Sequence, residues 1–317
     1  MTNKKRIVGV IGLGHVGAHV AFCLGMMGVA DEVLLCDLKE SKAISERQDL
    51  MDAVKFMPHN VNYKIVPYEG LGSCDIIVNA VGDITLCATG NRDDEMNFTV
   101  VQVASYIEKV MAGGFKGIFV NITNPCDVIT NLIARLSGLP KGHVLGTGTG
   151  LDTSRLVSAL AQKTGLESNS FTAYMMGEHG NAQMAPWSLV NFAGKSLKDY
   201  KDNPKFNFDH EEMKKTAIGG GWVTYSGKFC TEYGIASAAV TIVSAILRDE
   251  KKIMAASVEL DGQYGEKGIF AGCPAVLGAN GVEEVMEYNL PAEELAEFKE
   301  CCAKIRANIA KADKLLK

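Results

Sequence analysis

The chain has 317 residues, of which 47% are hydrophobic and 22% are charged, and its formal net charge is -5. These values are typical of an ordinary globular protein and give no reason to expect binding to nucleic acid or to a membrane. The nine cysteines form no C-x-x-C pair and no His/Cys cluster, so we expect no metal site and a reducing, cytoplasmic location.

Short apolar runs alternate with helical patterns through the first half of the chain. The strand-like runs are RIVGVI, EVLLCD, DIIVNAV, GIFVNI and HVLGTG, which begin at residues 6, 32, 75, 117 and 143. Because these runs are apolar on both faces and separated by helices, they predict a parallel sheet that is covered on both sides. We therefore predict a Rossmann-type, doubly wound α/β fold.

The pattern changes after residue 148. A helix over 151–164 leads to the strand-like FTAYMMG and then to turn-rich sequence. A long apolar helix over 235–249, strand-like runs over 252–260 and 269–278, and an amphipathic helix from residue 292 follow. This order predicts a mixed α+β second domain, so we expect domains at residues 1–147 and 148–317. No Pro/Gly/Ser-rich linker separates them, which favours an extensive interface.

The first strand-like run leads into GLGHVG, which places Gly12, Gly14 and Gly17 at the start of a helix. Such glycines permit a tight turn, close approach of a pyrophosphate and close helix–strand packing. This motif is weak when it stands alone, but Asp37 ends the second run 20 residues after Gly17. A carboxylate there accepts hydrogen bonds from ribose hydroxyls and repels a 2′-phosphate, so we predict NAD as the cofactor of residues 1–147.

Three later stretches carry polar residues that have two interpretations each. Asn124 in NITNP lies where ligands bind in such sheets, or it belongs to a turn before proline. Asp152 and Arg155 in GLDTSR share a helix face, which by itself is most often a surface ion pair. His179 in GEHG is an acid/base candidate or an ordinary loop histidine.

Together and in this order, these stretches resemble the L-lactate/malate dehydrogenase superfamily over essentially the whole chain. The resemblance implies hydride transfer between nicotinamide and a 2-hydroxy or 2-oxo acid, with residues 148–317 as the substrate and catalytic domain. It implies that His179 is the acid/base and that Asp152 orients it. It also implies that Arg155 binds the substrate carboxylate, that Asn124 contacts the reacting oxygen, and that Arg92 closes over the substrate and polarises its carbonyl.

The resemblance extends to further residues of the pocket and of the cofactor site. Thr231 matches the family's pocket threonine. The remaining positions that we expect in the cofactor site are His15, Val16, Lys42, Tyr68, Gly82 and Ile122, and the resemblance implies that Asn124 also lies near the nicotinamide.

The loop before Arg92 carries the information on substrate. Lactate dehydrogenases have a glutamine six residues before this arginine and malate dehydrogenases have an arginine, whereas this chain has Leu86. No residue over 83–91 is basic, so a second substrate carboxylate would find no partner in the loop. We predict 2-oxo acids with aliphatic or aromatic side chains, because the loop most resembles that of L-2-hydroxyisocaproate dehydrogenases.

Two alternatives remain open at this point. The chain could be an L-lactate dehydrogenase with an unusual loop, or a non-catalytic NAD-binding protein on the same fold. As partners we expect a small 2-oxo or 2-hydroxy acid, no nucleic acid and no membrane, and further copies of the chain in a homodimer or homotetramer.

Overall fold

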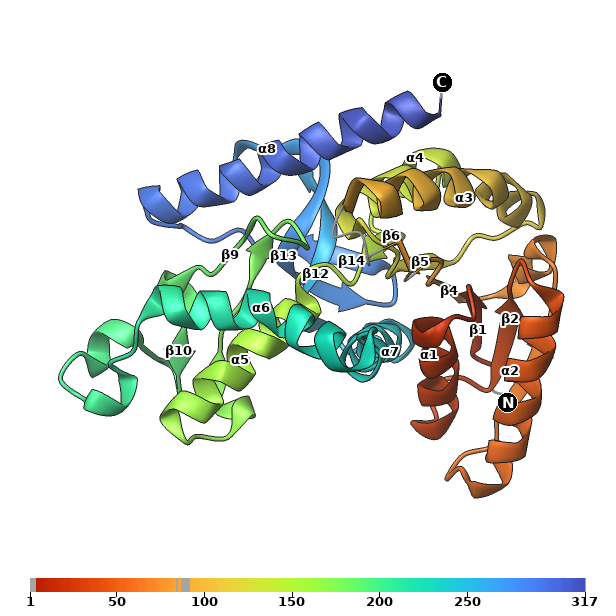
Figure 1. The fold of residues 1–317 in the computed structure, drawn as a ribbon, viewed down its shortest axis with the longest axis horizontal. Helices are drawn as coiled ribbons and strands as arrows, with labels where there is room; N and C mark the ends of the chain where they lie inside the picture. Colours follow the sequence, from red (N-terminus) through yellow and green to blue (C-terminus); the bar gives the residue numbers. More distant parts are fainter. Residues whose placement is uncertain (1–3, 84, 87–91, 317) are drawn as a thin grey trace.

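The computed structural model describes residues 4–83, 85–86 and 92–316, and for Arg92 and Asp93 it describes the backbone alone. Helices lie on both sides of one long central sheet, and a smaller lobe extends from one end of it (Figure 1). The expectations for the loop over 87–91 lie outside the described residues.

The first half of the chain alternates strands and helices. Its elements are β1 (Ile7–Ile11), α1 (His15–Met26), β2 (Glu32–Cys36), α2 (Glu40–Ala53), β3 (Asn62–Ile65), β4 (Ile76–Asn79), α3 (Arg92–Ala112), β5 (Ile118–Asn121), α4 (Cys126–Ser137) and β6 (Val144–Gly146). The strands lie in the order β3-β2-β1-β4-β5-β6, and all neighbours in this series are parallel. The predicted Rossmann-type fold is confirmed.

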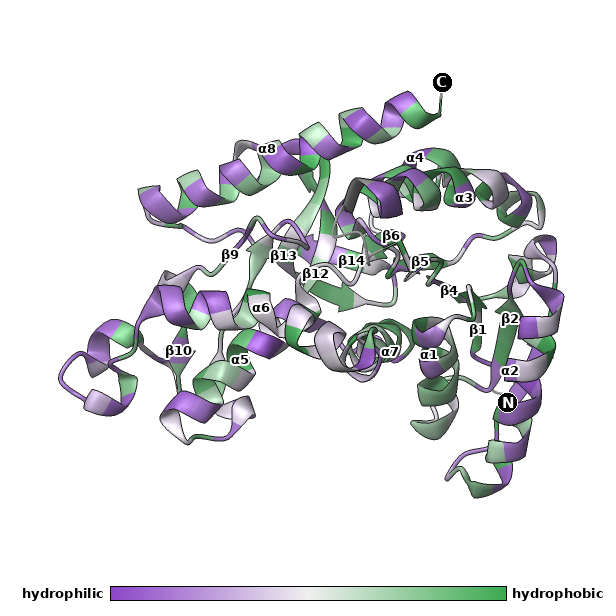
Figure 2. Ribbon diagram, viewed as in Figure 1, coloured by the Kyte–Doolittle hydropathy of each residue, from purple (hydrophilic) through white to green (hydrophobic). Residues whose placement is uncertain are grey.

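Alternate residues of these strands enter two separate hydrophobic cores. In β5, Ile118 and Val120 pack in the core that contains residues of α1, α2 and α7 (Tyr233–Leu247), whereas Phe119 packs in the core of α3 and α4. Figure 2 shows that the strands of this half are largely hydrophobic. Burial on both faces is the reason why the strands read as continuous apolar runs in the sequence.

The second half of the chain extends the same sheet. Its other elements are α5 (Gly150–Thr164), β7 (Phe171–Thr172), β8 (Met176–Gly177), β9 (Gln183–Met184), β10 (Asn191–Phe192), β11 (Lys195–Ser196), α6 (His210–Lys228), β12 (Lys252–Asp261), β13 (Lys267–Gly278), β14 (Gly281–Val285) and α8 (Ala292–Leu315). Strand β12 pairs antiparallel with β6, with Ser257 opposite Gly146, and β13, β8 and β9 follow. The sheet thus crosses the expected boundary at residues 147/148.

Short 3-10 helices join several of these elements. They are η1 (Val54–Phe56), η2 (Tyr68–Ser73), η4 (Ser168–Ser170), η5 (Trp187–Leu189), η6 (Leu197–Tyr200), η7 (Pro204–Phe206) and η8 (Gln263–Gly265). A separate small sheet has the order β11-β10-β7 and lies in the smaller lobe. Helix α8 crosses over α3, α4 and β13, and its residues alternate between hydrophilic and hydrophobic along its length (Figure 2).

Two elements differ from the sequence expectations. Strand β3 has only Tyr63 buried because it forms the edge of the sheet, so its sequence NYKI lacks the apolar signal of the inner strands. Helix α6 lies in the segment that we expected to be turn-rich, and three consecutive glycines over 219–221 weaken its helical pattern. Asp209 begins this helix by accepting hydrogen bonds from the backbone N–H groups of Glu211 and Glu212.

We predict that Phe119→Ala lowers the free energy of unfolding by about 3–5 kcal/mol, since it leaves a cavity in a tightly packed core. Phe119 is completely buried, whereas Phe56 is 81% exposed. Phe56→Ala is therefore the matched control and should change the free energy of unfolding by less than about 0.5 kcal/mol. Urea denaturation measures both values, and similar losses in the two variants would contradict the assignment of the core.

Candidate active site

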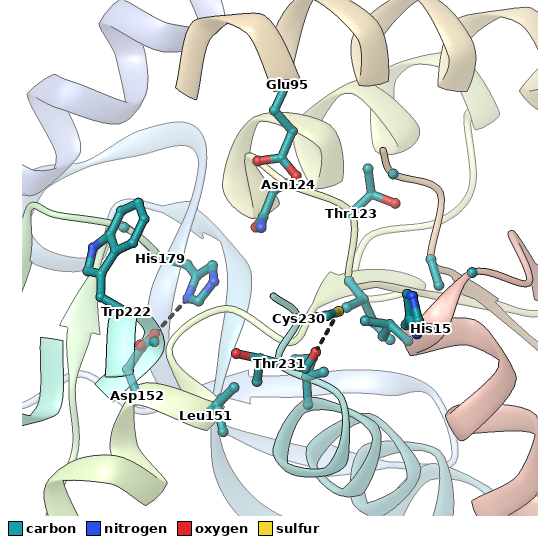
Figure 3. A pocket seen from close by; sticks show the side chains of 18 of the residues that line it. His15, Glu95, Thr123, Asn124, Leu151, Asp152, His179, Trp222, Cys230 and Thr231 are labelled. Atoms are coloured by element: carbon teal, nitrogen blue, oxygen red, sulfur yellow. Dashed lines mark hydrogen bonds and ion pairs between the residues drawn. The ribbon is translucent and has the colours of Figure 1, made fainter. Parts of the chain in front are cut away.

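A cavity of about 300 Å³ opens at the carboxyl ends of β1, β4 and β5 and is closed on its other side by the second half of the chain (Figure 3). Parallel sheets of this kind bind ligands at that edge. The cavity is lined by Gly14, His15, Val16, Ala80, Val81, Gly82, Asp83, Glu95, Ile122, Thr123, Asn124, Leu151, Asp152, Arg155, His179, Gly180, Asn181, Gln183, Ile218, Gly221, Trp222, Cys230, Thr231 and Ile235.

The glycine loop between β1 and α1 leaves its backbone open to a ligand. Gly12 has a φ of +86°, and a Cβ atom on Gly17 would lie 1.8 Å from the carbonyl oxygen of Gly12, so larger residues are excluded at both positions. No atom lies within 4 Å of the place where Gly14 would carry a Cβ atom. No side chain caps the amino end of α1, so its first N–H groups are available to an anion.

Asp37 follows β2 and stabilises this glycine loop by hydrogen bonding. Its carboxylate accepts hydrogen bonds from the backbone N–H groups of Leu13, at 2.7 Å, and of Lys39, at 2.8 Å. A carboxylate can accept about four hydrogen bonds, so the group still has capacity for ribose hydroxyls. The open backbone at Gly14 and the carboxylate at Asp37 fit a dinucleotide.

His179 and the buried Asp152 form a hydrogen-bonded pair on the opposite side of the cavity. His179 lies in the turn after β8 and Asp152 lies in the first turn of α5, and 2.6 Å separates Nδ1 of the imidazole from Oδ2 of the carboxylate. Because Nδ1 is used in this way, Nε2 is the ring nitrogen that can exchange a proton with a ligand. Figure 3 shows the imidazole at the wall of the cavity, joined to Asp152 by a dashed line.

The charge of Asp152 is set by its neighbours. Burial would raise the pKa of this carboxyl, but attraction to His179, the hydrogen bond to it and the charge of Arg155 together lower the pKa below its usual range. Asp152 therefore stays ionised and favours the imidazolium form of His179. The side chain of Asp152 is 1% exposed, which rules out the interpretation as a surface ion pair.

Arg155 lies one helical turn further along α5 and also faces the cavity. Its Nη1 donates a hydrogen bond to Oδ1 of Asp152 at 3.0 Å. Cβ atoms on Gly220 and Gly221 would lie 3.0 Å from Cδ and 3.4 Å from Nη2 of this arginine. The guanidinium thus lies against bare backbone of α6, and its remaining N–H groups can bind a carboxylate.

Asn124 lies at the top of the cavity in Figure 3, where the chain leaves β5. Thr99 donates a hydrogen bond from its hydroxyl to the backbone carbonyl of Asn124 at 2.7 Å. The side-chain Oδ1 of Asn124 is buried and has no hydrogen-bond partner among the described residues. A buried polar atom without a partner is costly, so this amide is suited to contact a ligand.

The structure brings most of the sequence-predicted site residues to one cavity, but not all of them. Thr231, Ile122 and Gly82 line it together with the glycine loop. Tyr68 instead stacks on Tyr106, and Lys42 pairs with Glu46 on the exposed face of α2. Leu86 lies outside the lining, and the side chain of Arg92, the first residue of α3, lies outside the described part of the chain.

Several residues that line the cavity were not predicted from the sequence. Trp222, Cys230, Ile218 and Ile235 come from the turn-rich and apolar segments of the second half, where nothing in the sequence marks them as pocket residues. Glu95 could have been predicted as a cavity residue from the sequence. It lies three positions after Arg92 and therefore on the same face of α3.

The described part of the chain also bears on metal binding and on membrane insertion. Over residues 4–83, 85–86 and 92–316, no three His, Cys, Asp or Glu residues lie where they could hold a metal ion together. No helix in these ranges has the length and apolar character that crossing a membrane requires.

The sequence matches the models of a known protein family over both halves of the chain. Residues 6–146 match the NAD-binding domain of lactate/malate dehydrogenases, and residues 149–316 match the α/β carboxyl-terminal domain of the same family. An L-lactate dehydrogenase of Fusobacterium nucleatum is 38% identical over 309 residues, which cover 96% of each protein.

Solved structures agree with this assignment. A minor L-lactate dehydrogenase from Enterococcus mundtii superposes with a TM-score of 0.92 at 31% identity, covering 97% of this chain and 98% of that one. The malate dehydrogenase of Cryptosporidium parvum superposes with a TM-score of 0.90 at 26% identity, covering 98% of this chain and 100% of that one. The chain therefore belongs to the lactate/malate dehydrogenase family of oxidoreductases, and NAD is its cofactor.

Proposed function

We propose that this protein is an L-2-hydroxyacid dehydrogenase that reduces 2-oxo acids with apolar side chains. The observation that carries the proposal is the hydrogen-bonded set of His179, Asp152 and Arg155, with separations of 2.6 and 3.0 Å, in one cavity with the glycine loop. A protein that only binds NAD has no need of this set, which argues against the non-catalytic alternative.

In the proposed reaction, the side chains bind and polarise the substrate while NADH bound along the glycine loop supplies the hydride. Arg155 binds the substrate carboxylate through two parallel N–H groups. His179 donates the proton on Nε2 to the carbonyl oxygen, and Asp152 stabilises the imidazolium before this transfer. We assign to Asn124 a contact with the reacting oxygen, and to Arg92 polarisation of the carbonyl group.

The cavity wall favours an apolar substrate side chain. Ile218, Trp222 and Ile235 line the cavity on the α6–α7 side. A second carboxylate would find no permanently charged cation besides Arg155 among the described lining residues. These residues support a 2-hydroxyisocaproate type of specificity, as does the loop over 83–91, in which Leu86 stands where lactate and malate dehydrogenases have a polar residue.

The second candidate is an L-lactate dehydrogenase, the name carried by the Fusobacterium nucleatum relative at 38% identity. Discrimination between apolar side chains by pocket size amounts to only about 1–3 kcal/mol per methylene group. The two candidates therefore differ in the order of preference among substrates, not in the reaction or its residues.

The remaining proposals concern the domain boundaries, the oligomeric state and the cellular compartment of the protein. We propose domains at residues 1–147 and 148–317 that are joined by the shared sheet. Exposed Trp222, Val223, Phe229 and Tyr233 on α6 and α7 support a homodimer or homotetramer. The described cysteines are all free, which supports a reducing compartment such as the cytoplasm.

His179→Asn should lower kcat by at least about a hundredfold, because it removes the proton donor. NADH binding, measured by fluorescence titration, should stay unchanged, since the glycine loop is intact. His59 is exposed and does not line the cavity, so His59→Asn is the control and should retain full activity. A variant at position 179 with near-normal turnover would refute the proposed role.

Asp152→Asn should move the alkaline limb of the pH profile for 2-oxo acid reduction to lower pH. The pKa of Asp152 is lowered, so in the wild type the carboxylate is charged through the assay range and favours the imidazolium there. Without this charge the histidine loses its proton at lower pH. Profiles of kcat/KM against pH measure the shift, and exposed Asp202→Asn is the control. An unmoved limb would contradict the electrostatic role.

A substrate panel separates the candidates. We expect kcat/KM with NADH to be highest for 2-oxoisocaproate or phenylpyruvate, lower for pyruvate, and lowest for oxaloacetate, whose second carboxylate is desolvated without a partner. Pyruvate as the best substrate would favour the L-lactate dehydrogenase. Oxaloacetate as the best substrate would contradict both candidates.

A further inference from the structure

Asp127 is a buried carboxyl group that the proposed reaction does not use. It lies in the first turn of α4 and is 2% exposed. Each of its two oxygens accepts one hydrogen bond: Oδ2 from the backbone N–H of His179, at 2.8 Å, and Oδ1 from the hydroxyl of Ser257, at 2.5 Å. The catalytic histidine is thus held at two points, by Asp152 on its ring and by Asp127 on its backbone.

These bonds join three distant parts of the chain. Asp127 is 52 positions from His179 and 130 positions from Ser257. It belongs to the helix that follows β5, whereas Ser257 lies in β12, opposite Gly146 in β6. Asp127 therefore fixes the turn that carries His179 relative to the dinucleotide-binding half and to the shared sheet.

Packing alone does not explain a carboxyl group at this place. Burial raises the pKa of Asp127 to about 6, although the hydrogen bonds from Ser257 and from the backbone of His179 oppose this shift. An apolar side chain of the same volume would avoid the desolvation cost. The carboxyl group differs from such a side chain in the two hydrogen bonds that it accepts.

Other contacts hold the flanks of the same turn. Glu178 accepts hydrogen bonds from the backbone N–H of Ala182 and from Nδ2 of Asn308, each at 3.1 Å. Gln183 donates from Nε2 to the carbonyl oxygen of Gly180 at 2.7 Å. The hydrogen bond that the backbone N–H of His179 donates to Asp127 acts on the backbone of residue 179 itself.

We propose that Asp127 is a positioning residue for the acid/base histidine. It holds the backbone of His179 where the imidazole reaches both Asp152 and the substrate carbonyl. The inference rests on the proposed function of His179. A displacement of about 1 Å in a catalytic group can cost about a hundredfold in rate, so loss of this anchor should act on kcat rather than on binding.

Three variants test the anchor with the full-length protein and the best substrate of the panel. Asp127→Ala removes both hydrogen bonds and should lower kcat at least about tenfold, while KM for the 2-oxo acid and the affinity for NADH stay within about threefold. Asp127→Asn should retain kcat within about threefold, because its Oδ1 can accept from His179 and its Nδ2 can donate to Ser257. A kcat of Asp127→Asn as low as that of Asp127→Ala would overturn the proposal.

The third variant covers the case in which Asp127→Ala does not fold. The double change Asp127→Val and Ser257→Ala fills the volume with methyl groups and removes the hydroxyl that would lose its acceptor. Only the N–H of His179 is then left without its acceptor, and kcat should fall at least about tenfold. A folded variant of either kind with kcat within about threefold of the wild type would refute the anchor.

A matched control separates positioning from general stabilisation. Asn131 is 7% exposed on the same helix and donates from Nδ2 to the carbonyl oxygen of Gly268 at 3.4 Å, away from the turn of His179. Asn131→Ala should lower the thermal midpoint without lowering kcat, and an equal loss of kcat would overturn the proposal. Activity in His179→Asn would defeat the proposed function itself, whereas an inactive His179→Asn beside a fully active Asp127→Ala would defeat this inference alone.

Discussion

The hydrogen bond between Asp152 and His179 is the contact on which the rest of the site depends. It brings a carboxylate that is 1% exposed within 2.6 Å of an imidazole on a different element. Removing the imidazole is costly, because it takes away part of the compensation for the desolvation of the buried Asp152 carboxylate. The start of α5 and the turn after β8 must therefore keep a fixed position relative to each other. Arg155 lies on the same helix and bonds to the same carboxylate, so it is positioned by the same requirement.

The shared sheet fixes the positions of these two parts of the chain relative to each other. The carboxyl ends of β1, β4 and β5 present the glycine loop, the backbone at Gly82 and the amide of Asn124 along one edge. Pairing of β6 with β12 then extends the sheet into the second half of the chain, so that β8 and its following turn face the same edge. A flexible linker between the halves could not hold a proton donor at a fixed place relative to a cofactor.

The sequence predicted those features that local chemistry determines. The inner strands were recognised within one or two residues because burial on both faces makes them continuously apolar, and the glycine loop because backbone approach excludes side chains. Strand β3 was missed because an edge strand buries only Tyr63, and α6 because its glycines weaken the pattern. Trp222 and Asp127 were missed for another reason: each is defined by contacts with residues far away in the sequence, which no local pattern encodes.

The distribution of charge in the cavity bears on the choice of substrate. Among the described lining residues, Arg155 is the permanently charged cation, and part of its charge is already balanced by Asp152. It can bind one carboxylate through its remaining donors. A second carboxylate would need a further cationic partner, and no other residue of the described lining carries a permanent positive charge. An apolar side chain needs no such partner, and it displaces water from the wall formed by Ile218, Trp222 and Ile235.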